Sequence, residues 1–96
     1  MAMRFETSDT SESAVVTALS ALRWTLEDER RSSRLLALTG LGADDLRSRL
    51  GDPTVLAEIL LFLESHEPDL IACAAAIGNT PDGLVNARRL LQDGAQ

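Results

Sequence analysis

Side chains able to do chemistry are few in this sequence and lie far apart. The chain contains one histidine, His66, and one cysteine, Cys73. A transition-metal site needs several imidazole or thiolate ligands at fixed spacing, and a catalytic cysteine needs a base beside it. Cys73 lies in an apolar run, where a thiol behaves as a small hydrophobic side chain with a raised pKa. We therefore expect no catalytic residue, no metal and no cofactor, and we predict that the chain is not an enzyme.

Paired carboxylates are the other pattern that could indicate acid–base chemistry. They occur at Asp44 and Asp45, at Glu27 to Glu29, and at Glu64 with Glu67. All of these groups fall at the ends of predicted helices, where the helix dipole and solvation already favour charged residues. His66 is interpreted in the same way, as a capping or solvated side chain, with a pH switch as the alternative.

Two helix–turn–helix patterns, at residues 36–50 and 73–91, suggest a DNA-binding regulator as the alternative function. The second pattern is the better candidate, because Asn86, Arg88 and Arg89 on its trailing helix would contact nucleic acid. The first pattern places two aspartates where they would repel phosphates. A net charge of −6 also repels polyanions. Nucleic acid is therefore disfavoured as a partner.

Length and composition predict one globular domain. The 96 residues suffice for one hydrophobic core, and 45% of them are hydrophobic. No apolar stretch is long enough to span a membrane, and the N-terminal residues do not resemble a secretion signal. We expect a cytoplasmic protein with residues 1–9 as a mobile tail, a helical domain over 10–92 and a frayed C-terminus over 93–96.

The apolar periodicity and the helix stop and start signals divide the domain into short helices. Val15, Leu19, Leu22 and Leu26 recur at helical spacing and predict a first helix over about 10–28, its apolar stripe widened by alanines at 14, 18 and 21. Residues 27–34 are interpreted as a solvated corner, whose arginines at 30, 31 and 34 pair with the acidic residues at 27–29. Shorter helices are then expected over 35–39, 43–50, 53–64, 68–77 and 81–92, separated by glycine stops and begun by proline or capping residues.

These helices are too short for a long up-and-down bundle, so the predicted fold is all-α, a compact orthogonal bundle of five to six short helices in a single domain. The run of Ala and Ile at 70–77 is apolar all round and is expected to be buried. The helix over 53–64 is apolar around most of its circumference. Either a neighbouring helix covers it or a partner does, and in the second case Leu56, Leu60 and Leu63 would form the partner surface.

One segment resembles a family of small alphaproteobacterial helical proteins of unknown function. The resemblance is carried by Leu38–Leu41, by Asp45–Arg47 and by Gly51–Pro53 followed by an apolar helix, and it extends over about 21–91. It implies a compact helical domain in a bacterial cytoplasm, with no catalytic residue to carry over. The leading hypothesis is a non-catalytic protein–protein interaction or regulatory module that binds an unidentified protein or associates with itself as a homodimer.

Overall fold

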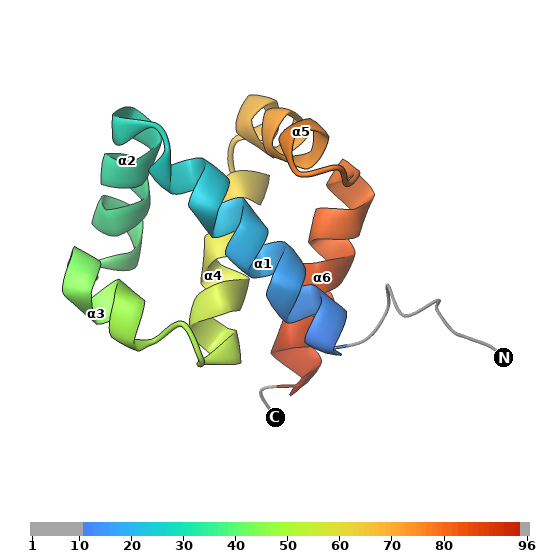
Figure 1. The fold of residues 1–96 in the computed structure, drawn as a ribbon, viewed down its shortest axis with the longest axis horizontal. Coiled ribbons are helices and arrows are strands. Elements are labelled where there is room, and N and C mark those ends of the chain that lie inside the picture. Colours follow the sequence, from blue (N-terminus) through green and yellow to red (C-terminus); the bar gives the residue numbers. More distant parts are fainter. Residues whose placement is uncertain (1–10, 95–96) are drawn as a thin grey trace, which may run out of the picture.

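The chain folds into six helices within residues 11–94, the part that the computed structural model describes. They are α1 (Ser11–Leu26), α2 (Glu29–Thr39), α3 (Ala43–Ser48), α4 (Pro53–Glu64), α5 (Glu67–Ala76) and α6 (Pro81–Gly94). This range contains no strand, and the helices cross one another in a compact array (Figure 1). The predicted all-α fold is confirmed. The expected tail over 1–9 lies outside the described residues, and α6 continues two residues past its predicted end at 92.

Helix boundaries follow the predicted capping chemistry. The Asp52 carboxylate accepts a hydrogen bond from the backbone N–H of Thr54 at 2.9 Å, and Pro53 opens α4 where no intrahelical donor is lost. Gly40 and Gly78 both have φ of +73°, the left-handed conformation that ends a helix and that glycine adopts without strain. These local signals explain why the starts and stops agree with the sequence pattern.

The core-facing side of α1 is its alanine stripe. Ala14, Ala18 and Ala21 are buried, and α1 packs closely on α4 and α6 (Figure 1). Small side chains allow helix axes to approach, because no bulky group separates the backbones. The predicted leucine stripe is only partly buried: Leu19 is 37% exposed and Leu26 is 46% exposed. The prediction that this stripe faces the core was therefore wrong for both residues.

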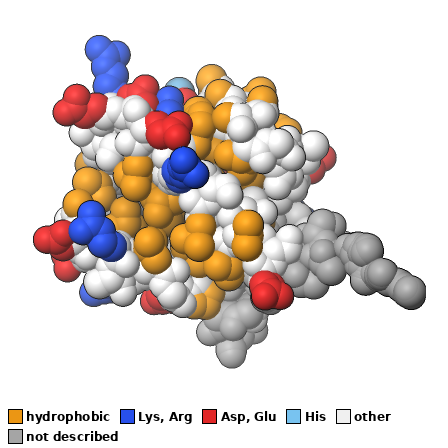
Figure 2. All heavy atoms as spheres, in the orientation of Figure 1, with side chains coloured by type: hydrophobic (Ala, Val, Ile, Leu, Met, Phe, Trp, Pro, Cys, Tyr) orange, Lys and Arg blue, Asp and Glu red, His pale blue; other side chains and the backbone are white. Residues whose placement is uncertain are grey.

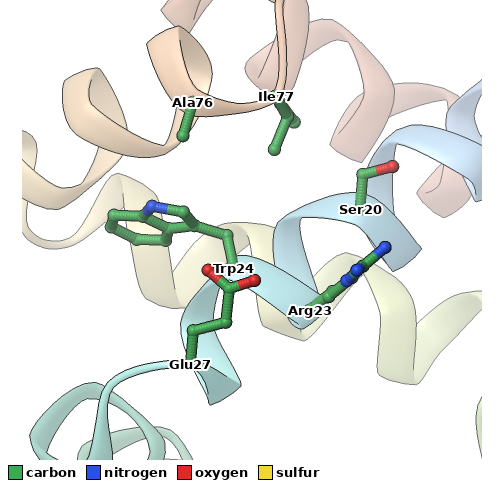
Figure 3. A pocket seen from close by; sticks show the side chains of 6 residues that line it. All are labelled: Ser20, Arg23, Trp24, Glu27, Ala76 and Ile77. Carbon is green, nitrogen blue, oxygen red and sulfur yellow. The ribbon is translucent and has the colours of Figure 1, made fainter.

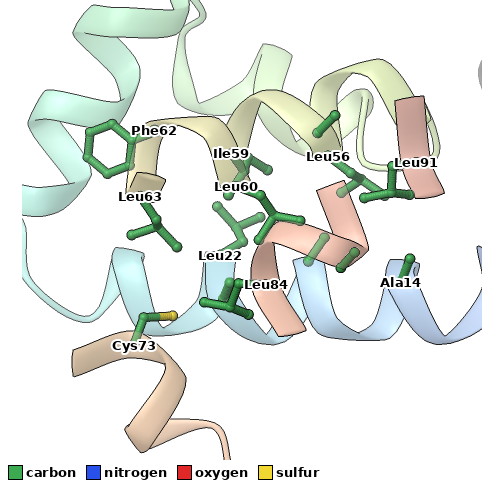
Figure 4. Close-up of a cluster of buried hydrophobic side chains, with 14 of the residues drawn as sticks. Ala14, Leu22, Leu56, Ile59, Leu60, Phe62, Leu63, Cys73, Leu84 and Leu91 are labelled. Atoms are coloured by element: carbon green, nitrogen blue, oxygen red, sulfur yellow. The ribbon is translucent and has the colours of Figure 1, made fainter. Parts of the chain in front are cut away.

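Helix α4 lies at the centre of the bundle, covered by α1 on one side and α6 on another. Leu56, Leu60 and Leu63 are all buried within the chain (Figure 4). Their assignment to a partner surface was wrong, because α1 and α6 already cover that side of α4. The large apolar circumference of this helix is explained by its central position.

Helix α2 begins earlier than predicted, within the charged segment interpreted as a corner. Asp28 is its N-cap, and its carboxylate accepts hydrogen bonds from the backbone N–H groups of Arg30 at 2.8 Å and Arg31 at 3.3 Å. These bonds stabilise the charged form and lower the pKa of Asp28. The Arg31 guanidinium stacks on Trp24, 3.6 Å from the ring centroid, and donates a 2.7 Å hydrogen bond to the Trp24 carbonyl. Arginine side chains thus join α2 to α1.

Helix α5 lies at the edge of the array and buries one side only. Leu70, Cys73 and Ala74 are buried, whereas Ile71 is 51% exposed and Ala72 is exposed. The prediction of a completely buried helix was wrong, because α5 packs mainly on α1, α4 and α6 and the side turned away from them stays exposed. Each exposed alanine leaves only a small apolar area in water, so an alanine-rich sequence does not indicate how much of its helix is buried.

The two faces of α1 give a direct test of this packing. Ala18→Leu adds bulk at a fully buried position and is expected to destabilise the fold by about 1–3 kcal/mol through overpacking. Leu19→Ala, on the next residue, is expected to cost less than Ala18→Leu, about 1 kcal/mol, because Leu19 is already 37% exposed and its truncation forces no overlap in the core. Urea unfolding of both variants measures the difference. A larger loss for Leu19→Ala would show that the leucine stripe faces the core.

Candidate functional site

Arg88, one of the three residues named for the DNA-binding alternative, is engaged inside the fold. Arg88 Nε and Nη2 donate hydrogen bonds of 2.7 and 3.0 Å to the two carboxylate oxygens of Glu64, and Nη1 donates to Gln92. Both side chains of the ion pair are largely buried. The hydrogen bonds that Arg88 donates to Glu64 raise the pKa of Arg88. This forked pair joins α6 to the end of α4, so the guanidinium of Arg88 already has a partner within the chain.

The other two residues of that group lie elsewhere on α6. Asn86 is partly buried, and Arg89 is exposed. Of the three predicted contacts, Arg89 alone presents an exposed cationic side chain. One exposed arginine supplies far less phosphate neutralisation than the several contacts that hold a protein on DNA.

The arginines of α2 line an open hollow of about 720 Å³ with neighbouring carboxylates. Arg34 donates a 2.6 Å hydrogen bond to Asp69 of α5, and Arg31 pairs with Asp28 at 3.2 Å. The predicted pairing with residues 27–29 is thus correct for Arg31, whereas Arg34 pairs with a more distant partner. The charges of this hollow are largely balanced, so it does not form an anion site.

The two residues with distinctive chemistry remain apart. Cys73 is buried, and burial raises the pKa of its thiol to about 11, as the sequence predicted in direction. His66 is the N-cap residue of α5, half exposed, with Nε2 4.0 Å from Asp69 Oδ2. Within residues 11–94, no group of three or more His, Cys, Asp or Glu side chains is placed to hold a metal ion.

A small polar pocket of about 290 Å³ lies between α1 and the end of α5. Trp24 and Glu27 form one wall, Ala76 and Ile77 lie opposite, and Arg23 extends beside Ser20 (Figure 3). Its only aromatic wall is Trp24, which Arg31 already covers on one face. Its polar lining consists of the Ser20 hydroxyl, the Glu27 carboxylate and the Arg23 guanidinium.

The feature that stands out is the outward side of α1. Its exposed residues follow one another at helical spacings of four, three, four and three, and we call them the outer face of α1: Glu12, Val16, Leu19, Arg23 and Leu26. Val16 is 60% exposed, and two leucines lie beside it. Isolated exposed apolar side chains are normal on protein surfaces, but a continuous row along one helix is typical of an interaction surface.

An apolar groove adjoins this face: one part lies between α1 and the α2–α3 pair, and the other between α1, the start of α4 and the end of α6. It contains two pockets, of about 130 and 210 Å³, which share Leu50 as a common wall. Leu22 and Leu26 line the first pocket from α1, and Val15 lines the second. In the space-filling view, hydrophobic side chains gather on this side of the molecule, along α1 and toward α2 and α3 (Figure 2).

Sequence reasoning missed this surface because α1 carries two apolar stripes. Both have helical period, and the leucines and the alanines were interpreted together as one widened stripe. The informative signal was that Ala14, Ala18, Ala21 and Thr25 repeat at the same spacing as the leucines. A stripe of small residues is what close helix packing requires.

The Glu64–Arg88 pair makes a prediction about stability. Arg88→Ala leaves a largely buried carboxylate without its partner and is expected to destabilise the fold by about 1.5–3 kcal/mol. Arg89→Ala, at the exposed neighbouring position, is the matched control and is expected to change stability by less than about 0.5 kcal/mol. Chemical denaturation of both variants measures the two changes in the free energy of unfolding. Equal values would mean that the pair is solvated and contributes little.

Cys73 makes a prediction about reactivity and pH. Its pKa rises from 9.0 to about 11, so at about pH 8 the fraction of Cys73 present as thiolate is about 100-fold smaller in the folded than in the unfolded protein. Dithiobis-nitrobenzoate should therefore modify the folded protein slowly and the urea-unfolded protein rapidly. Since the folded pKa is the higher one, the protonated thiol stabilises the fold below pH 9.0, and this contribution is lost as pH rises toward about 11. Rapid modification of the folded protein would contradict the burial.

No helix among the described residues is long and apolar enough to cross a membrane. No curated protein and no solved structure matches the chain. One family model matches residues 11–94, a longer range than the 21–91 over which the sequence resemblance was expected. The chain therefore belongs to the family described as Protein of unknown function (DUF3572).

Proposed function

We propose that this protein is a non-catalytic interaction module that binds an amphipathic helix of its partner on the outer face of α1 and in the adjoining groove. The observation that carries the proposal is that Leu19 and Leu26 of α1 are 37% and 46% exposed, while the alanines of this helix and Leu22 make its core contacts. Leucines that the fold does not need for its own core are available to a partner. Helix-in-groove recognition uses such rows of apolar anchors.

The shape of the groove favours a helix as the occupant. Its two pockets lie in succession along α1 and share Leu50, so they are placed to receive successive side chains from one face of a docked helix. The outer face of α1 carries an acidic residue, Glu12, at one end and a basic residue, Arg23, toward the other. The expected partner helix therefore has an apolar face bordered by one basic and one acidic side chain.

The roles of the charged residues support a non-catalytic module. Glu64 is engaged by Arg88, Asp28 caps α2, and Asp69 accepts from Arg34. Each of these carboxylates therefore has a structural role. The DNA-binding alternative loses its main support because Arg88 is held by Glu64, and we do not propose it.

Site-specific photo-crosslinking tests this function. A photoreactive phenylalanine analogue at position 26 lies in the groove, and the same analogue at position 38 is the control, because Leu38 is 64% exposed on α2 outside the groove. In the native host, position 26 should give one discrete adduct whose cross-linked segment, identified by mass spectrometry, is an amphipathic helix. Identical adducts at both positions, or none at position 26, would overturn the proposal.

A further inference from the structure

The outer face of α1 has a pattern that is complementary to itself. Glu12, Val16, Leu19 and Arg23 are spaced by four, three and four residues, so the row is symmetric about its midpoint between residues 17 and 18. Reversing its direction exchanges the two apolar residues and exchanges the acid with the base. A second α1 laid antiparallel across this midpoint therefore places Val16 against Leu19 and Glu12 against Arg23, and a two-fold axis repeats each contact.

Only the antiparallel arrangement places each acidic residue opposite a basic one. A parallel pair would place Glu12 against Glu12 and Arg23 against Arg23, and like charges at such positions are unfavourable. The antiparallel pair also opposes the helix dipoles, with the acid in the first turn of one helix and the base in the last turn of the other.

The two charged residues are not used within the described part of the fold. Neither Glu12 nor Arg23 forms an ion pair with another residue of 11–94, and both are exposed. By contrast, Arg34 and Arg88 each form an ion pair with a carboxylate of another helix. The charges on the outer face of α1 are thus available for a second molecule.

The position of α1 allows such an approach. Figure 1 shows α1 lying across α4 and α6 on one side of the molecule, with no helix in front of it. The row from Glu12 to Arg23 extends about 16 Å at the helical rise of about 1.5 Å per residue. A second helix can therefore contact the whole row.

We propose that the chain associates with a second copy of itself through antiparallel contact of α1 with α1, with Glu12 of each copy paired with Arg23 of the other. This inference rests on the proposed function and names the partner helix. The net charge of −6 on each copy opposes association, but at physiological salt that repulsion is screened beyond about 8 Å. An interface built mainly on one helix is small, so the dimer is weak and dissociates on dilution.

Charge exchange tests the pairing and its register. Sedimentation equilibrium over a concentration series should show a monomer–dimer equilibrium for the unmodified chain. Glu12→Arg alone and Arg23→Glu alone each create two like-charge contacts, so each should weaken dimerisation about tenfold or more. The double variant, E12R with R23E, should recover the original dissociation constant within about twofold.

Mixing the two single variants gives a second readout that misfolding cannot imitate. A heterodimer of E12R with R23E has opposite charges at both contacts, so the mixture should dimerise at concentrations at which each variant alone is largely monomeric. Leu19→Asp should abolish dimerisation, whereas Leu38→Asp, at an exposed apolar position on α2, should leave it unchanged.

Each outcome is decisive. A chain that stays monomeric at all concentrations, or single variants whose mixture remains monomeric, overturns the antiparallel pairing. If position 26 nevertheless cross-links to a helix of another protein, the proposed function stands and only the identity of the partner changes. If neither dimer nor discrete adduct is found, both proposals fall.

Discussion

The close contact of α1 with α4 and α6 is the constraint on which the rest of the structure depends. It is possible because Ala14, Ala18 and Ala21 present almost no side-chain bulk to the core. The consequence for α4 is that Leu56, Leu60 and Leu63 are covered. The consequence for α1 is that Val16, Leu19 and Leu26 are directed to the surface. The close packing of α1 on α4 and α6 therefore accounts for both the buried centre and the apolar outer face of α1.

Ion pairs between helices, forked at Arg88 and single at Arg34, add to this packing. Arg88 connects α6 to Glu64 of α4, and Arg34 connects α2 to Asp69 of α5. Arginine suits this role because its planar guanidinium donates several hydrogen bonds in fixed directions. With these arginines engaged in the fold, a basic surface of the kind that binds nucleic acid does not form on α6.

Most helix boundaries could be predicted from the sequence because they depend on local chemistry, although the start of α2 at Glu29 was missed. Asp52 before Pro53, and glycine at position 40, act within one helical turn. Which side of a helix is buried could not be predicted, since α1 has two stripes of equal period and tertiary packing selects between them. The hydrophobic run of α5 was misleading for a related reason, because hydrophobicity does not report how many neighbours surround a helix.

Contacts between distant segments were predicted least well, because the sequence does not indicate which residues meet. Arg88 and Glu64 are 24 residues apart, and Arg34 and Asp69 are 35 apart. A sequence offers many such pairings, and only the folded chain selects one. The candidate site on the outer face of α1 likewise became visible only once the structure showed that Leu19 and Leu26 lie outside the core.

The stacking of Arg31 on Trp24 has a practical consequence. Trp24 is the only tryptophan of the chain, so the intrinsic fluorescence above the tyrosine range comes from one indole at the junction of α1 and α2. A guanidinium held 3.6 Å from the ring perturbs the excited state, and its departure changes the emission. The protein thus carries a single fluorescent reporter, Trp24, on α1, the helix that carries the proposed partner surface.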